Sequence, residues 1–152
     1  PIIMKLLETR AKFDSITVMV QKEVADRLCA KTGTREVGAI TYAVEYYADA
    51  KKLFLVPNTS FIPMPNVESE VIMLEVKQDK FWNVKDEEML FKVIKYAFMQ
   101  RRKTLTNALQ GMDIPKDKSK EILNKLNLDE RVRGEALSLE DFINIANLLH
   151  LI

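Results

Sequence analysis

Residues 56–71 read Val56-Pro57-Asn58-Thr59-Ser60-Phe61-Ile62-Pro63-Met64-Pro65-Asn66-Val67-Glu68-Ser69-Glu70-Val71, and the rest of the fold is arranged around this stretch. Three of the chain's five prolines lie in it. Proline fixes φ and pushes the residue before it toward extended conformations, so the sequence predicts a stiff loop here. Apolar runs flank the loop at residues 52–56 and 70–77 and predict two strands, the second of them apolar on both faces.

Phe61 lies at the centre of this loop. A phenylalanine held between two core strands can close the end of the sheet as a plug. It can equally offer a flat platform on which a ligand stacks. The residues around Phe61 leave both interpretations open.

The other periodic segments predict an α/β layer followed by a helical region. Apolar spacing predicts helices over residues 2–10, 22–30 and 36–48, and a β-branched run predicts a strand over residues 15–20. With the strands around the loop, this order is typical of an α/β layer that ends in an antiparallel pair. We therefore expect a first domain over residues 1–77.

Beyond residue 77 the strand-forming residues disappear and the spacing becomes helical. Helices are predicted over residues 86–109, 116–126 and 138–149. Ser138 followed by Asp141 is a helix start, although Glu or Gln is the preferred partner at that position. A small all-helical domain is expected over residues 78–152.

The composition excludes several classes of protein and site. Hydrophobic residues make up 47% and charged residues 30% of the 152 residues, as in a soluble globular protein. No apolar run reaches the roughly 18 residues that a membrane span needs. Cys29 and His150 are the single cysteine and histidine. We therefore expect no disulfide, no His/Cys metal site and no His-based catalytic triad, and a reducing, cytoplasmic location.

The net charge of +1 conceals a basic segment. Between Met89 and Met112 there is no acidic residue, so the cations there give the segment a charge of +5 and leave −4 for the rest. These five cations are Lys92, Lys95, Arg101, Arg102 and Lys103. Exposed helices usually mix both signs of charge and gain from Glu–Lys pairs. The face is either an ordinary solvated surface or a surface suited to phosphates, and the missing acids favour phosphates.

Arg101 does not lie with the other cations on a helical wheel. At about 100° per residue it falls at the edge of the apolar stripe. Either the helix breaks near Gln100, or Arg101 is partly buried and paired with an acid such as Glu135 or Glu140. Arginine tolerates such a place because a carboxylate can accept two hydrogen bonds from its planar guanidinium.

Three motifs resemble a known family. Residues 61–69 resemble the F-x-P-x-P-x-V-x-S signature of the ribosomal RNA adenine dimethyltransferases. Residues 98–105 are similar to the F-x-Q-R-R-K-T signature of the KsgA branch of that family. The Arg133-Gly134-Glu135 pattern followed by Leu137-Ser138 resembles the branch's R-A-E-x-L-S ending, with Gly134 in place of the usual alanine. Residues 1–7 resemble the helix that follows the family's N-L-P-Y motif.

The resemblance implies a fold and an activity. It implies a Rossmann-like domain and a helical RNA-binding domain, in an S-adenosylmethionine-dependent enzyme that dimethylates N6 of two adjacent adenines near the 3′ end of 16S ribosomal RNA. Phe61, supported by Pro63 and Pro65, would stack on the extruded adenine. The small ribosomal subunit would be the partner. Its RNA phosphates would bind to the five cations Lys92, Lys95, Arg101, Arg102 and Lys103.

The resemblance also implies that the catalytic and cofactor-binding residues lie outside this chain. The family's glycine-rich cofactor loop and N-L-P-Y motif would precede Pro1, so we expect the downstream half of the methyltransferase domain, unable to bind S-adenosylmethionine or turn over alone. A cut sheet would expose apolar surface, so self-association or a rearranged core is expected. The alternatives are a non-catalytic RNA-binding or ribosome-assembly module, and a basic face that binds an acidic protein.

Overall fold

The structure is a computed structural model that describes residues 2–9, 13–78 and 82–151. The predicted helix end at Arg10 lies outside these residues. The chain divides into two compact units: residues 1–31 and 40–80 form the first, and residues 32–39 and 81–152 form the second. In their described parts, the first unit is α/β and the second is α-helical.

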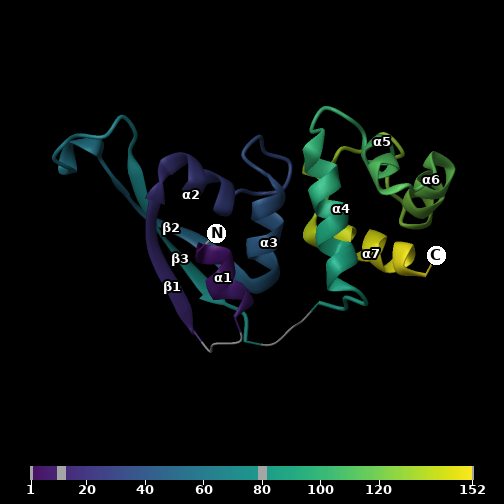
Figure 1. Cartoon of the computed structure of the whole chain (residues 1–152), viewed down its shortest axis with the longest axis horizontal. Coiled ribbons are helices and arrows are strands. Elements are labelled where there is room, and N and C mark those ends of the chain that lie inside the picture. Colours follow the sequence, from purple (N-terminus) through teal and green to yellow (C-terminus); the bar gives the residue numbers. More distant parts are fainter. Residues whose placement is uncertain (1, 10–12, 79–81, 152) are drawn as a thin grey trace. The chain divides into compact units, whose positions relative to one another are not determined.

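The first unit contains a three-stranded antiparallel sheet (Figure 1). Its strands are β1 (Ser15–Gln21), β2 (Ala48–Val56) and β3 (Ser69–Val76), and β3 lies between the other two. The predicted antiparallel pair of β2 and β3 is confirmed. Strand β2 begins four residues earlier than the predicted strand over residues 52–56, because it continues directly from the preceding helix.

Three helices lie on one face of this sheet (Figure 1). They are α1 (Ile2–Glu8), α2 (Lys22–Leu28) and α3 (Ala39–Tyr47). Alternate residues of the strands point toward them, as the period of two in a strand requires. The core between the helices and the sheet contains the buried side chains of Leu7, Ile16, Ala25, Leu28, Val44, Ala48, Ile72 and Leu74.

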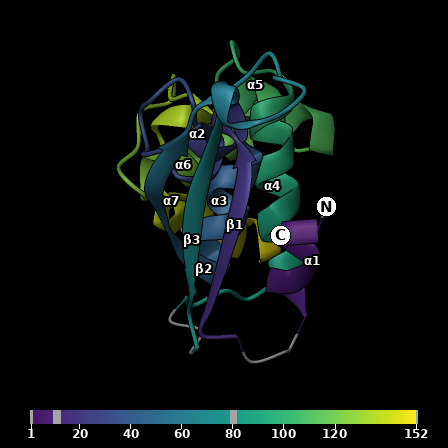
Figure 2. The same cartoon turned by 90° about the vertical axis from the view of Figure 1, so that its left-hand side faces the viewer.

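Among the described residues of the first unit, no helix covers the other face of the sheet (Figure 2). Val71 of β3 is paired with Met19 of β1 on one side and with Phe54 of β2 on the other. Paired residues point to the same face of a sheet, so these three side chains share a face. Met19 is 51% and Phe54 58% exposed, whereas Val71 and Met73 are half-buried. The prediction that β3 is apolar on both faces is confirmed, and only one of these faces is covered within the unit. We call Met19, Phe54, Val71 and Met73 the open sheet face.

The described part of the second unit, residues 32–39 and 82–151, is helical and contains no strand. Its helices are α4 (Glu87–Met99), α5 (Leu105–Leu109), α6 (Lys116–Lys125) and α7 (Leu139–His150), with 3₁₀ turns η2 (Gln110–Met112) and η3 (Gly134–Ala136). A short 3₁₀ helix, η1 (Asn58–Ser60), belongs to the first unit. The core of the second unit contains Leu90, Ile94, Leu105, Leu109, Leu123, Leu139, Phe142 and Ile145.

Helix α7 begins as the sequence predicts. The Ser138 hydroxyl accepts a hydrogen bond from the backbone N–H of Asp141 at 3.1 Å, and the Asp141 carboxylate accepts one from the backbone N–H of Ser138 at 3.0 Å. This reciprocal capping box satisfies two donors at the helix start, with aspartate in the place of glutamate.

One sequence prediction is wrong. The single helix over residues 86–109 is interrupted, because α4 ends at Met99 and α5 starts after Thr104. The compact units differ from the expected domain bounds in one segment, since residues 32–39 group with the second unit. The reason is long-range, since side-chain and backbone contacts from residues 101 and 135 hold this segment. For the same reason α3 begins at Ala39 and not at residue 36.

Candidate nucleic-acid interface

The loop that carries Phe61 is closed by hydrogen bonds across its ends. After the 3₁₀ turn η1, the Phe61 N–H donates to the Asn58 carbonyl at 3.3 Å. The Asn58 side-chain amide in turn donates to the Pro65 carbonyl at 3.3 Å, on the far side of Phe61. The Ile62–Pro63 peptide bond is cis. Because both ends of the segment are joined in this way, the loop holds Phe61 in an extended conformation with φ near −120°.

The Phe61 ring is half-buried, so it is not enclosed by the core. Its neighbours on the loop are more exposed: Ile62 is fully accessible and Met64 is 61% exposed. A hollow of about 340 Å³ borders the loop and is lined by the polar residues Asn58, Asn66 and Glu68 together with the first residues of α2. Phe61 is therefore not a fully buried plug.

Helix α4 presents two of the predicted phosphate-binding cations. Asp86 caps its start by accepting from the Met89 N–H at 3.1 Å. Leu90, Val93, Ile94 and Ala97 are buried on one side of the helix. Lys92 and Lys95 lie three residues apart on the other side and are exposed, and Met99 continues the same face.

The turn after α4 presents two more cations. The Lys103 N–H donates to the Gln100 carbonyl at 3.0 Å and closes the turn. Thr104 then caps α5, its hydroxyl accepting from the Asn107 N–H at 3.4 Å. Between them, Arg102 and Lys103 are exposed. The break at Gln100 therefore places these two side chains on a turn instead of on the helical stripe that the wheel assumed.

The four cations of α4 and the turn after it lack an acidic partner. Within the part of the chain that the structure describes, Lys92, Lys95, Arg102 and Lys103 form no ion pair. Three of the four lysines of α6 in the same unit are paired: Lys118 and Lys125 with Glu121, and Lys120 with Glu130. We call the four unpaired residues the basic face. Their positive charge is available to an anion from outside the chain.

Arg101 is arranged differently. Its Nη2 donates to the carbonyls of Arg35 at 3.0 Å and Val37 at 2.7 Å. The same nitrogen lies 3.7 Å from the Glu135 carboxylate, and the guanidinium lies 5.8 Å from the centre of the Phe98 ring. The helix ends before Arg101, as the first alternative predicted. Arg101 also pairs with Glu135, as in the second alternative, but its side chain is 41% exposed and not buried.

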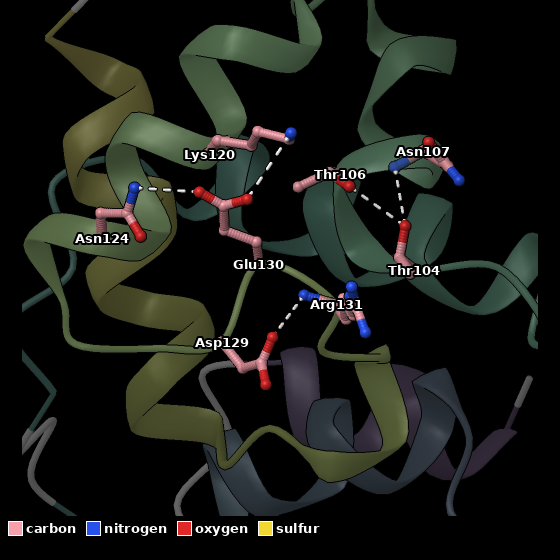
Figure 3. A network of polar contacts seen from close by, with 8 residues as sticks. All are labelled: Thr104, Thr106, Asn107, Lys120, Asn124, Asp129, Glu130 and Arg131. Carbon is pink, nitrogen blue, oxygen red and sulfur yellow. Dashed lines mark hydrogen bonds and ion pairs between the residues drawn. The ribbon is translucent and has the colours of Figure 1, made fainter.

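Two arginines beside the turn were not among the predicted phosphate-binding residues. The Leu105 N–H donates to the Val132 carbonyl at 2.8 Å, so residues 131–133 run next to residues 104–105. Arg131 and Arg133 on this segment are exposed and, in the described ranges, have no ion pair. Figure 3 shows Arg131 on this segment, with Thr104 and Thr106 at the start of α5. A local signal existed, since Arg133 is the first residue of the Arg133-Gly134-Glu135 motif and Arg131 lies two residues before it.

The segment that carries Arg131 is fixed by polar contacts with α6 (Figure 3). The Glu130 carboxylate accepts from the Asn124 amide at 3.2 Å and lies 3.5 Å from the Lys120 amine. The Asp129 carboxylate accepts from the Arg131 N–H at 2.8 Å. These contacts order the backbone before Arg131, so the side chains of Arg131 and Arg133 start from a defined position.

The residues present do not fit an S-adenosylmethionine site of the glycine-rich type. The chain has four glycines, at positions 33, 38, 111 and 134. Gly111 belongs to η2, and Gly134 is buried where an added Cβ would lie 3.0 Å from the Cβ of Ala97. None of the four lies in a loop from a strand to a helix. Among the described residues no group of three or more His, Cys, Asp or Glu side chains could hold a metal ion.

The chain was compared with known proteins. The family model described as "Ribosomal RNA adenine dimethylase" matches residues 1–151. Among curated relatives, the chain is 46% identical over 151 residues to ribosomal RNA small subunit methyltransferase A of Clostridioides difficile (strain 630), covering 99% of this chain and 52% of the relative. It is also 46% identical over 153 residues to the protein of that name from Geobacillus kaustophilus (strain HTA426), again covering 52% of it. The chain thus spans about half the length of these relatives.

Two solved structures share the fold. A dimethyladenosine transferase from Plasmodium falciparum superposes with a TM-score of 0.82 at 24% identity, over 99% of this chain and 62% of that one. The 23S rRNA methyltransferase ErmE superposes with a TM-score of 0.69 at 15% identity, over 98% of this chain and 59% of that one. The fold is therefore α/β with a small antiparallel sheet, as in these methyltransferase structures. Among the described helices, none has the length and apolar character that crossing a membrane requires.

Proposed function

The chain belongs to the ribosomal RNA adenine dimethylase family, and we propose on this basis that it supplies the RNA-binding part of an S-adenosylmethionine-dependent enzyme. The reaction is the dimethylation of N6 on two adjacent adenines near the 3′ end of small-subunit ribosomal RNA. The curated relatives named above, called ribosomal RNA small subunit methyltransferase A, support this substrate. In this proposal, residues of the first unit are the downstream half of a Rossmann-like domain and the helical second unit binds RNA.

The basic face carries the proposal. It comprises four exposed cations without acidic partners in the described residues, on α4 and the turn that follows it. RNA phosphates release counterions when such cations neutralise them, which makes binding strong at low salt and weak at high salt. Arg102 has the fork that binds two phosphate oxygens at once, whereas Lys92, Lys95 and Lys103 act as point charges.

Phe61 has a role in the same reaction. A base inside a stack does not expose its exocyclic amine to a methyl donor, so the enzyme must extrude the adenine. A half-accessible ring on a loop closed by hydrogen bonds offers a surface for the extruded base before it arrives. Stacking of this kind contributes about 1–3 kcal/mol per base. Pro63 and Pro65 restrict the loop on either side of Met64.

The methyl donor does not bind to this chain by itself in our proposal. None of its glycines forms a cofactor loop, as described above, and the relatives are about twice as long as the matched region. We therefore assign no catalytic step to a residue of this chain. Its residues bind and orient the RNA, and the methyl transfer uses S-adenosylmethionine held elsewhere in the complete enzyme.

RNA binding at varied salt tests the proposal. The probe is a hairpin from the 3′ end of small-subunit ribosomal RNA whose loop holds two adjacent adenines. Each lost phosphate contact lowers the slope of log K against log salt by about 0.7–0.9. We expect Arg102→Gln combined with Lys103→Gln to lower it by about twice that amount between 50 and 200 mM salt.

The matched control is Lys118→Gln combined with Lys125→Gln, which removes two lysines already paired with Glu121. This control is expected to leave the slope unchanged. Equal effects of the two double variants, or binding that ignores salt, would contradict the RNA interface. Titration of the chain with S-adenosylmethionine in a calorimeter is expected to give no binding heat, and a measurable heat would contradict the cofactor assignment.

A further inference from the structure

The Arg101 guanidinium is engaged inside the second unit. One of its nitrogens donates to two backbone carbonyls, those of Arg35 and Val37. These acceptors lie 66 and 64 residues away in the sequence. Hydrogen bonds from a charged donor are stronger than neutral ones, contributing about 1.5–3 kcal/mol. A phosphate would have to compete with these contacts to bind Arg101.

The charge of Arg101 is also balanced within the unit. Glu135 lies 3.7 Å from the same nitrogen, and the two side chains are only 41% and 32% exposed. The ring of Phe98 faces the guanidinium from a further direction. An arginine already paired with a carboxylate adds little net positive charge to a surface, in contrast to Arg102, which follows it directly and has no such partner in the described residues.

These contacts hold residues 32–39 in place. The Gly33 N–H donates to the Glu135 carbonyl at 2.9 Å, and Val37 is fully buried. Between these two anchored positions, Arg35 is exposed and has no ion pair among the described residues. Its carbonyl, and not its side chain, is what Arg101 contacts. The Arg35 side chain is therefore free to face solvent beside Arg101.

We propose that Arg35 is an RNA-phosphate ligand and that Arg101 is the positioning residue that brings it to the basic face. This inference rests on the function proposed above and adds one residue to its interface. The Arg35 backbone is held by Arg101, which directly precedes Arg102, and Gly33 on the same segment is bound to Glu135, two residues beyond Arg133. A cation from a distant part of the sequence thereby joins the cations on α4 and the turn.

A double-mutant cycle tests the inference with the same RNA hairpin and salt range. Arg35→Gln removes the cation but keeps the carbonyl that Arg101 holds, and we expect the salt slope to fall by about 0.7–0.9, one phosphate contact. Arg101→Gln releases residues 32–39, and we expect the salt slope to fall by the same amount. The double variant is expected to fall no further, because both changes remove the same contact. Lys125→Gln, a paired lysine, is the control and leaves the slope unchanged.

Amide hydrogen exchange distinguishes positioning from direct contact. The Gly33 N–H is expected to exchange faster in Arg101→Gln and at the wild-type rate in Arg35→Gln. A double variant that loses two phosphate contacts would overturn the inference, because Arg101 would then bind RNA itself. An Arg35→Gln slope equal to wild type would overturn it too. If Arg35→Gln has no effect while Arg102→Gln lowers the slope, this inference fails and the proposed function stands; if neither has an effect, the proposed function fails.

Discussion

At the scale of single residues, the cations of the basic segment differ in the groups that surround their side chains. The sequence predicted five phosphate ligands from the composition of one segment and from a family resemblance. The structure places Arg101 apart from the other four, because carbonyls and a carboxylate surround its guanidinium. A helical wheel indicated that Arg101 was unusual, but the carbonyls that it holds lie more than 60 residues away. No local pattern contains that information.

Phe61 gives a prediction at the same scale. In the RNA hairpin described above, replacing one target adenine by an abasic site removes the base that stacks. We expect the wild-type chain to lose about 5- to 150-fold in affinity, which corresponds to the 1–3 kcal/mol of stacking. Phe61→Leu is expected to bind intact and abasic RNA almost equally, because leucine has no flat face. Equilibrium fluorescence anisotropy measures both affinities.

The control for this change is Phe54→Leu, which alters a phenylalanine that is more exposed but lies on β2 outside the loop. It is expected to keep the full abasic penalty. An abasic penalty that Phe61→Leu leaves intact would refute the stacking role. It would favour the alternative that the chain is a non-catalytic RNA-binding module.

At the scale of elements, most of the predicted helices and strands are present, and the predictions were least accurate at the ends of the elements. Apolar spacing identified β1, β3, α6 and α7 to within about two residues, because burial on one side imposes the period. The helix predicted over residues 86–109 was too long. Thr104 before Leu105 is a recognisable N-cap, which marks the start of a separate helix. The start of α3 had no comparable signal, since contacts from Arg101 and Glu135 determine it.

The capping box of α7 provides a prediction for an element. Ser138→Ala removes the hydroxyl that accepts from the Asp141 N–H, and loss of such a cap costs about 1 kcal/mol. We expect the second unit to be destabilised by that amount, as followed by urea unfolding monitored through helical circular dichroism. Ser138→Thr keeps an acceptor and should retain most of the stability. Equal stability of the alanine and threonine variants would show that the cap contributes nothing.

At the scale of the whole molecule, the sequence predicted the open sheet face only in part. Alternating apolar residues in β3 predicted two apolar faces, and the structure covers one of them within the first unit. Which side would be covered depended on where α1, α2 and α3 pack, which strand periodicity does not specify. The expected rearrangement of the core is not seen in the described residues, where the three strands keep a regular antiparallel order apart from one shift between Lys52 and Phe54.

Self-association is the expected consequence of the open sheet face. Met19 and Phe54 expose apolar surface on either side of Val71 of β3, and exposed apolar patches drive association in water. We expect the mass from sedimentation equilibrium to rise with protein concentration, and Phe54→Lys to keep the chain monomeric. Val24→Lys on α2, where the side chain is 41% exposed, is the control and should associate like wild type. A wild-type chain that stays monomeric at high concentration would contradict this expectation.

The membership of residues 32–39 in the second unit also has a consequence during protein synthesis. These residues are made long before Arg101 and Glu135, which hold them, because 66 residues separate Arg35 from Arg101. At roughly 5–20 residues per second, the nascent chain waits on the order of 3–13 seconds for its partner. The second unit therefore cannot close until the ribosome has translated the motif around Glu135, and a stall before that point leaves the Gly33 N–H without its acceptor.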